Sequence, residues 1–157
     1  MRTAVLTVST TVSARKAEDR SGPVLAARAE AAGCDVVAME VVPDDFALIE
    51  DRLRHFVDAG CEVVLTTGGT GFTPDDITPE ATRAVIEREA PGIVEAMRAV
   101  SLAHTPMAVL SRAVAGIREA TLIGNLPGAP KAVEECFGVR EPVLGHAVQT
   151  LRGDSGH

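Results

Sequence analysis

The stretch EVVLTTGGTGFTPDDITPEAT (residues 62–82) joins a short apolar run to three glycines within four positions, and two adjacent aspartates follow. The apolar run 62–67 is typical of a buried strand, and Pro79 suits the first turn of a helix that we expect to reach about residue 90. The glycines 68–71 are therefore expected between a strand and a helix. In an open α/β sheet this junction lies at the carboxyl edge of the strands, where ligands bind.

Strand-like and helix-like segments alternate on both sides of this stretch. On the N-terminal side we expect a strand over 2–9, a loop over 10–20, a helix over 23–33, a strand over 34–42 and a helix over 45–59. On the C-terminal side we expect a helix over 93–103, two short strands within 113–126 that turn at 116–119, a turn and a short helix within 128–138, and a last helix near 142–151. The alternation predicts one α/β domain over residues 1–157, a three-layer sandwich with a mostly parallel sheet and helices on both faces, ending in a flexible tail at about 152–157.

The composition excludes several classes of function. A net charge of −7 disfavours non-specific binding to nucleic acid or to anionic membranes. No apolar run approaches the roughly 18 residues that a membrane span needs. The N-terminal MRTAVLTVST has no signal-peptide pattern, so we expect a cytoplasmic protein with no nucleic-acid or membrane partner. Cys34, Cys61 and Cys136 have no metal-ligand spacing and are expected to be buried, reduced thiols.

The loop of Gly68, Gly69, Thr70 and Gly71 has two interpretations. Glycines permit a tight turn with positive φ, and they also let backbone N–H groups approach an anion closely. No Gly-Lys-Ser/Thr follows, so the loop is not a Walker A motif, and the third glycine of GxGxxG is missing. The density of glycines around Thr70 favours phosphate binding.

The aspartates near this loop also have alternative interpretations. Asp75 and Asp76 are either solvated loop acids or ligands that hold Mg²⁺ against a polyphosphate. One of them could instead cap the helix near Pro79, for which Thr78 is better placed. Asp44 lies just before a predicted helix, so as an isolated residue it is favoured as a helix N-cap. In the predicted topology it nevertheless reaches the same rim of the sheet as the glycine loop.

A second glycine–proline loop, NLPGAPKAV (125–133), again joins a strand to a helix. Lys131 at the start of that helix opposes the helix dipole unless an anion binds beside it, so it is either a phosphate contact or a surface lysine. Ser111 and Arg112 precede another short strand and could face the same pocket. No ligand spacing is found among the four histidines, His55, His104, His146 and His157.

Several motifs together resemble the MogA/MoaB family of molybdenum-cofactor biosynthesis proteins, whose molybdopterin-binding domain also occurs in gephyrin-like proteins. The most specific motifs are TTGGTG (66–71), DDITPEAT (75–82) and LPGAPKAV (126–133). Further matches extend the resemblance to nearly the whole chain: EDRSGPVL (18–25), VVPDD (41–45), EREAPGIVEAMR (87–98) and LSRAVAGIR (110–118).

The resemblance implies a molybdopterin adenylyltransferase, in which the terminal phosphate of molybdopterin attacks the α-phosphate of ATP with Mg²⁺ and releases pyrophosphate. It implies catalytic and metal-binding roles for Asp44 and Asp76. It implies contacts to phosphate or substrate for a larger set of residues: Gly68, Gly69, Thr70, Gly71, Asn125, Pro127, Gly128 and Lys131. It also implies a homotrimer, or a hexamer made of two trimers.

The chain departs from the family's pattern at two places. Thr10 and Thr11 stand where many members carry an Asp-Arg pair after the first strand, and Asp75 stands where they often carry Arg. These departures keep a second interpretation open, namely a non-catalytic or weakly active molybdopterin-binding protein of the same fold. A third interpretation is a related enzyme that cleaves another pyrophosphate.

Overall fold

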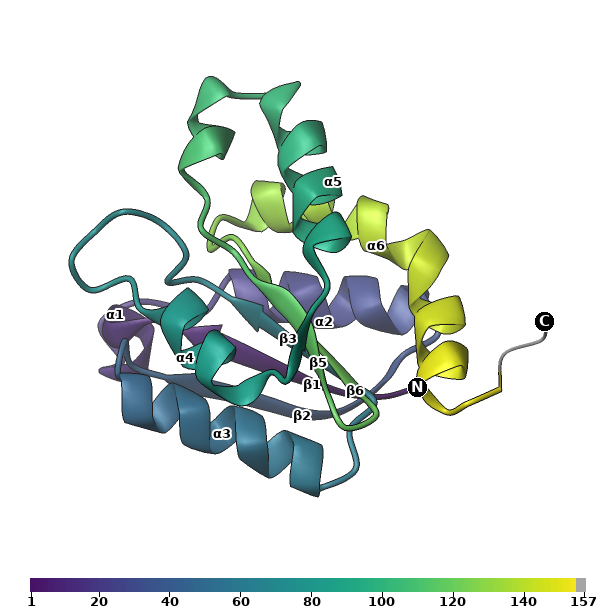
Figure 1. The fold of residues 1–157 in the computed structure, drawn as a ribbon. Helices are drawn as coiled ribbons and strands as arrows, with labels where there is room; N and C mark the ends of the chain where they lie inside the picture. The colour runs from purple at the N-terminus through teal and green to yellow at the C-terminus, as the bar shows by residue number, and fades with distance from the viewer. Residues whose placement is uncertain (155–157) are drawn as a thin grey trace.

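One six-stranded sheet forms the centre of the molecule in the computed structural model, which describes residues 1–154 (Figure 1). The strand order is β2-β1-β3-β6-β5-β4. The first four strands in this order are parallel to one another, whereas β5 runs antiparallel to both of its neighbours, β6 and the edge strand β4. Their bounds are β1 (Arg2–Val8), β2 (Asp35–Val42), β3 (Val63–Thr67), β4 (Arg88–Glu89), β5 (Ala115–Arg118) and β6 (Thr121–Leu126).

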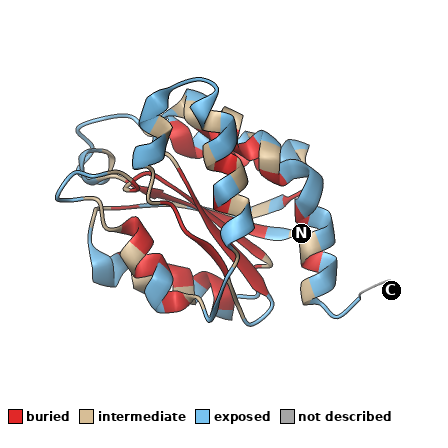
Figure 2. Ribbon diagram, turned by 45° about the horizontal axis from the view of Figure 1, so that its top comes forward, coloured by how far each residue is buried: buried red, intermediate tan, exposed pale blue. Residues whose placement is uncertain are grey.

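Helices cover both faces of this sheet (Figure 2). One face packs against α2 (Ser21–Ala31), α5 (Pro91–Leu102) and α6 (Pro130–Leu151). The other face packs against α3 (Phe46–Asp58) and α4 (Thr78–Val85). The short helix α1 (Thr10–Ser13) and the 3-10 helix η1 (Pro106–Leu110) lie in connecting segments. The predicted three-layer α/β sandwich is confirmed.

The core is largely aliphatic, with Phe56 and Phe137 as its buried aromatic residues, and the sheet divides it into two clusters. All five residues of the central strand β3 are buried, because helices cover it on both sides. Leu65 belongs to the cluster under α2 and α6, and Val64 to the cluster under α3 and α4. The three cysteines are buried and unbonded, in agreement with the prediction. No helix within residues 1–154 is both long enough and apolar enough to cross a membrane.

The helix predicted from Pro79 to about residue 90 is too long. It ends at Val85, and β4 follows directly. The backbone amide of Glu87 donates to Ile117 O at 2.8 Å, and that of Ala90 to Ala115 O at 2.9 Å. Pairing with β5 therefore satisfies backbone groups that a longer helix would have used, and a two-residue strand carries no sequence pattern of its own.

The two helices predicted over 128–138 and 142–151 are one helix, α6, with Pro142 inside it. Proline lacks the N–H that would bond to the carbonyl four residues earlier, which is why a break is the natural prediction. The buried residues Phe137 and Arg140 before Pro142, and Leu144 and Val148 after it, pack on the same face of the sheet. Because both halves are held on the sheet by this packing, the helix does not end at the proline.

Three smaller boundaries also differ from the predictions. The loop expected over 10–20 contains α1, which begins because Ser9 Oγ accepts from the Val12 amide. The β5–β6 turn lies at Glu119, whose φ is 52°, rather than at 116–119 as a whole. Of the predicted flexible tail, residues 155–157 lie outside the described part of the chain, and Arg152 is held by Glu62.

Candidate functional site

The candidate residues gather where parallel strands end. β1, β3 and β6 are neighbours in the sheet, and the loops that follow them meet at one edge (Figure 1). A Cβ atom on Gly128 would lie 3.3 Å from the Cα of Gly68, so the two glycine loops are in contact. The two loops therefore converge at the carboxyl edge of the sheet.

Gly68 and Gly69 are required by the backbone, with φ of 96° and 68°. A Cβ on Gly68 would lie 2.4 Å from Val8 O, and one on Gly69 would lie 2.3 Å from Thr78 Oγ1. Thr78 fixes this turn, because its Oγ1 donates to Gly68 O at 3.0 Å and its amide to Gly69 O at 3.2 Å. Thr78 is the first residue of α4 and does not cap that helix by its side chain.

The tight turn explains Gly68 and Gly69, and it is compatible with phosphate binding by the amides that follow. The amide of Gly68 donates to Leu126 O at 3.2 Å and is thus engaged inside the sheet. Within residues 1–154, the amides of Gly69, Thr70 and Gly71 have no hydrogen-bond acceptor. Consecutive free amides next to two glycines are the donor pattern of an anion-binding nest.

Asp44 does not cap α3, and the prediction that favoured this role is wrong. Asp45 is the cap, since its Oδ1 accepts from the Leu48 amide at 3.0 Å. The Oδ2 atom of Asp44 accepts instead from Thr10 N at 3.1 Å and from Thr10 Oγ1 at 2.8 Å. Its Oδ1 faces the glycine loop, 3.2 Å from the position that a Cβ on Gly69 would take. Thr10 thus orients one oxygen of Asp44 and leaves the other for a ligand.

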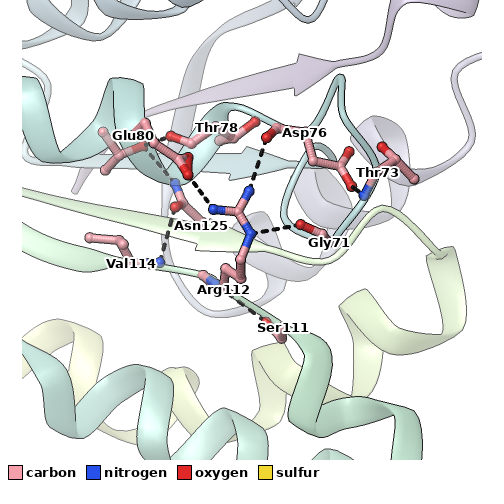
Figure 3. A network of polar contacts seen from close by, with 11 residues as sticks. Gly71, Thr73, Asp76, Thr78, Glu80, Ser111, Arg112, Val114 and Asn125 are labelled. Atoms are coloured by element: carbon pink, nitrogen blue, oxygen red, sulfur yellow. Dashed lines mark hydrogen bonds and ion pairs between the residues drawn. The ribbon is translucent and has the colours of Figure 1, made fainter.

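Asp76 lies at the other end of the same loop (Figure 3). Its Oδ2 accepts from the Thr73 amide at 3.1 Å and lies 2.9 Å from the position of a Cβ on Gly71. Asp76 is partly buried, whereas Asp75 is exposed and makes no hydrogen bond within residues 1–154. Asp75 therefore has the surroundings of a solvated loop acid. Asp76 and Asp44 lie on either side of the glycine loop.

Arg112 holds this loop from outside, a role that its sequence position did not predict (Figure 3). Its Nε donates to Gly71 O at 2.7 Å and its NH2 to Asp76 O at 2.9 Å. Its NH1 pairs with Glu80 in the first turn of α4. Arg112 belongs to the LSRAVAGIR motif, but the loop that its side chain contacts lies more than thirty residues earlier in the sequence.

The side chain of Asn125 is fully buried and engaged inside the protein. Its Oδ1 accepts from the Val114 amide at 3.0 Å, and its Nδ2 donates to Thr66 Oγ1 at 3.0 Å and Thr82 Oγ1 at 2.9 Å. Asn125 therefore joins β3, β6 and α4, and both polar atoms of its side chain have partners inside the protein. Lys131 is exposed and makes no ion pair within residues 1–154.

Two cavities lie at the glycine loop. One, of about 250 Å³, has mostly apolar walls and is lined by Thr70, Gly71, Ser111 and Pro127 among others. The other, of about 280 Å³, lies near the start of α2 and is lined by Gly68, Gly128 and Asp19. Asp19 was not predicted as a site residue, although the EDRSGPVL motif contains it. Its carboxylate accepts from Thr7 Oγ1 and from the Gly22 amide, both at 2.9 Å.

Two buried groups beneath the site have shifted pKa values. Burial raises the pKa of the Cys136 thiol, which lines the apolar cavity. Burial lowers the pKa of the Arg140 guanidinium to about 10, because a charged group is poorly solvated there. Arg140 NH2 donates to Asn125 O at 2.8 Å, so the arginine supports the second loop from below and remains charged at neutral pH.

Comparisons with known proteins agree with this geometry. The family model described as a probable molybdopterin binding domain matches residues 4–146. The chain is 46% identical to the molybdopterin adenylyltransferase of Haemophilus influenzae over 90% of this chain and 74% of that protein. It is 43% identical to the molybdenum cofactor synthesis protein cinnamon of Drosophila melanogaster, over 96% of this chain but only 25% of that protein, so it spans a quarter of this longer relative.

A solved structure agrees with the fold. The crystal structure of MoaB from Thermus thermophilus superposes with a TM-score of 0.91 at 44% identity, covering 97% of this chain and 96% of that one. The chain therefore belongs to the MogA/MoaB family of molybdopterin-binding domains.

Proposed function

We propose that the chain is a molybdopterin adenylyltransferase. In this reaction a phosphate oxygen of molybdopterin forms a bond to the α-phosphorus of ATP, the bond from that phosphorus to the bridging oxygen breaks, and pyrophosphate leaves. The observation that carries the proposal is the loop 69–71, whose amides are free while the carboxylates of Asp44 and Asp76 lie against its two ends. The Haemophilus relative, which carries this activity in its name, supports the same reaction.

The donor chemistry of the site fits Mg²⁺. Within residues 1–154, Asp44 and Asp76 each have one carboxylate oxygen that accepts hydrogen bonds and one that accepts none. No group of three or more His, Cys, Asp or Glu side chains that could hold a metal occurs within residues 1–154. Mg²⁺ commonly takes one or two carboxylates and completes its shell with substrate phosphates and water. When bound, it would neutralise charge on the polyphosphate.

The chain's own residues would act by orientation. The free amides of Gly69, Thr70 and Gly71 would hold a phosphate group, and Thr10 would keep the carboxylate of Asp44 turned towards it. Because the nucleophile is an oxygen of the substrate, the protein needs no nucleophile of its own. Positioning and charge compensation are the main contributions that phosphoryl-type transfer requires.

A nucleotide screen with pyrophosphate detection tests the proposal. With molybdopterin present, we expect pyrophosphate release from ATP and formation of adenylyl-molybdopterin. Molybdopterin binding without pyrophosphate release from any nucleotide would instead identify a binding protein. Pyrophosphate release that does not depend on molybdopterin would identify an enzyme that cleaves another pyrophosphate.

The binding protein is the second candidate, and Thr10 is the observation that favours it. Thr10 stands where many members of the family carry an acid, and here it bonds to Asp44 through both its amide and its hydroxyl. One acid fewer at this rim reduces the negative charge available to a metal. The retained Asp44 and Asp76 favour catalysis, and we therefore rank the enzyme first.

We also propose a homotrimer, or a hexamer of two trimers, in the cytoplasm, where ATP is available and the three buried thiols stay reduced. Val37, Met39 and Val41 alternate along the edge strand β2, so they share one face, and they are 39%, 50% and 38% exposed. An apolar strip on an edge strand is suited to burial against another copy. Light scattering at micromolar concentration should return the mass of a trimer or hexamer, and a monomer would contradict this assembly.

A further inference from the structure

The loop that carries Asp76 has few contacts of its own. Between Gly71 and Asp76 its internal hydrogen bonds are Asp76 N to Thr73 O at 3.0 Å and Thr73 N to Asp76 Oδ2 at 3.1 Å. Phe72, at its tip, is 66% exposed, and Asp75 is exposed as well. A loop with so little buried surface needs an external contact to hold a carboxylate in one place.

Arg112 supplies that contact at both ends of the loop (Figure 3). One guanidinium reaches Gly71 O at the start and Asp76 O at the end, and the Arg112 amide donates to Thr70 O at 2.9 Å. The planar fork of arginine can hold two carbonyls in fixed directions, which the single ammonium of lysine cannot reproduce. The contact is specific to arginine.

The guanidinium of Arg112 contacts the loop 71–76 and Glu80, and it does not line either cavity that a substrate could occupy at the glycine loop. Glu80 pairs with its NH1, so much of its charge is compensated inside the protein. Arg112 is not among the residues that line either cavity at the glycine loop. A substrate in the apolar cavity would therefore contact Thr70 and Gly71 and not the guanidinium.

We propose that Arg112 is a positioning residue that sets the affinity of the Asp44–Asp76 carboxylate pair for a divalent cation, by holding both ends of the loop 71–76. This inference rests on the proposed function, because it assumes that the pair binds a metal with the nucleotide. Outer contacts that orient metal ligands typically change metal affinity about 10- to 100-fold when they are removed.

The test measures binding of Mn²⁺, a spectroscopic substitute for Mg²⁺, by electron paramagnetic resonance in the presence of α,β-methylene-ATP, which resists cleavage at the reacting bond. We expect Arg112→Lys to weaken Mn²⁺ binding about 10-fold or more. Arg118→Lys is the matched control, because Arg118 also bonds a backbone carbonyl (Val85 O, 3.0 Å) and pairs with a glutamate, but away from this loop. It should leave Mn²⁺ affinity unchanged.

Amide hydrogen exchange gives a second readout that does not depend on metal. In Arg112→Lys the Thr73 amide, which donates to Asp76 Oδ2, should exchange faster, while the control keeps the wild-type rate. Glu80→Gln, which keeps Arg112 but removes its charged partner, should have an intermediate effect and serves if Arg112→Lys does not fold.

The results can reject the role of Arg112 without rejecting the metal site. If Asp76→Asn weakens Mn²⁺ binding but Arg112→Lys and Glu80→Gln match the wild type in affinity and in Thr73 exchange, the positioning role is wrong and the metal site stands. If the wild-type protein binds no Mn²⁺ with the nucleotide analogue, the proposed metal site fails and the role of Arg112 fails with it.

Discussion

At the scale of single residues, the glycines of the loop after β3 are required by the backbone, and the same loop is the proposed phosphate site. Gly68 and Gly69 adopt positive φ, and their neighbours leave no room for a Cβ. The amides that follow are free, and two carboxylates lie beside them. The sequence offered the tight turn and phosphate binding as alternatives. The structure contains the turn, and its geometry is compatible with the proposed phosphate binding.

A side chain at Gly69 should destabilise the fold in two ways, by backbone strain at positive φ and by a steric clash with Thr78. Gly69→Ala should lower the free energy of unfolding by more than about 2 kcal/mol, since the residue keeps a φ of 68° and the new Cβ meets Thr78 Oγ1. Gly33→Ala is the control, because its φ is 89° but nothing lies within 4 Å of the new Cβ. It should cost about 1 kcal/mol. Equal losses in urea titrations of the two variants would argue against a clash with Thr78.

At the scale of helices and strands, the sequence predicts regular elements well and their exceptions poorly. The apolar runs of β1, β2 and β3, the aspartate cap of α3 and the glycines that follow α2 and α3 are local signals, and the elements follow them. β4 exists only because β5 offers hydrogen bonds, and α6 continues through Pro142 because both halves pack on the sheet. These are tertiary effects, which no local window contains.

The proline inside α6 leads to a prediction about stability. It is exposed, and it deprives α6 of one backbone hydrogen bond, so Pro142→Ala should raise the free energy of unfolding by about 1–3 kcal/mol. Thermal unfolding followed by circular dichroism measures the change. A lower melting temperature would mean that the proline bend is needed for the packing of α6.

The candidate site was predictable to a similar extent. Asp44, Asp76 and the glycine loop follow from strand ends and motifs, which are features of local sequence. The support from Arg112 could not be predicted, because its partners Gly71 and Asp76 become neighbours only after the chain has crossed the sheet. The bonds of the Asn125 side chain could not be predicted either, since its three partners come from three segments.

At the scale of the whole molecule, one ion pair ties the C-terminal end of α6 to the start of β3. Arg152 Nε donates to Glu62 Oε1 at 2.8 Å, and the Glu62 carboxylate also accepts from the Arg2 amide at 3.1 Å. The hydrogen bonds from Arg152 lower the pKa of Glu62 below its ordinary value of 4.5. The pair closes the edge of the sheet opposite the candidate site.

This pair predicts a pH dependence of stability. Because the pKa of Glu62 is lower in the folded state, its contribution is fully present above pH 4.5 and is lost as the pH falls through the folded-state pKa. Arg152→Gln should lower the free energy of unfolding by up to about 1 kcal/mol at pH 7, since the pair is partly exposed, and by less at pH 3. An equal difference at both pH values, measured by urea titration, would contradict the assignment.

Asp76 is proposed to serve a metal-assisted transfer at the glycine loop, and the activities of Asp76→Asn and Asp75→Asn decide whether it does. Asp76→Asn keeps an oxygen that can accept from the Thr73 amide but removes the charge, so adenylyl-molybdopterin formation should fall by several orders of magnitude. Its stability should stay within about 0.5 kcal/mol of the wild type. Asp75→Asn, one residue away and exposed, should keep nearly full activity. Equal activity in the wild type and Asp76→Asn would show that this carboxylate is only a solvated loop acid and that the proposed metal site is wrong.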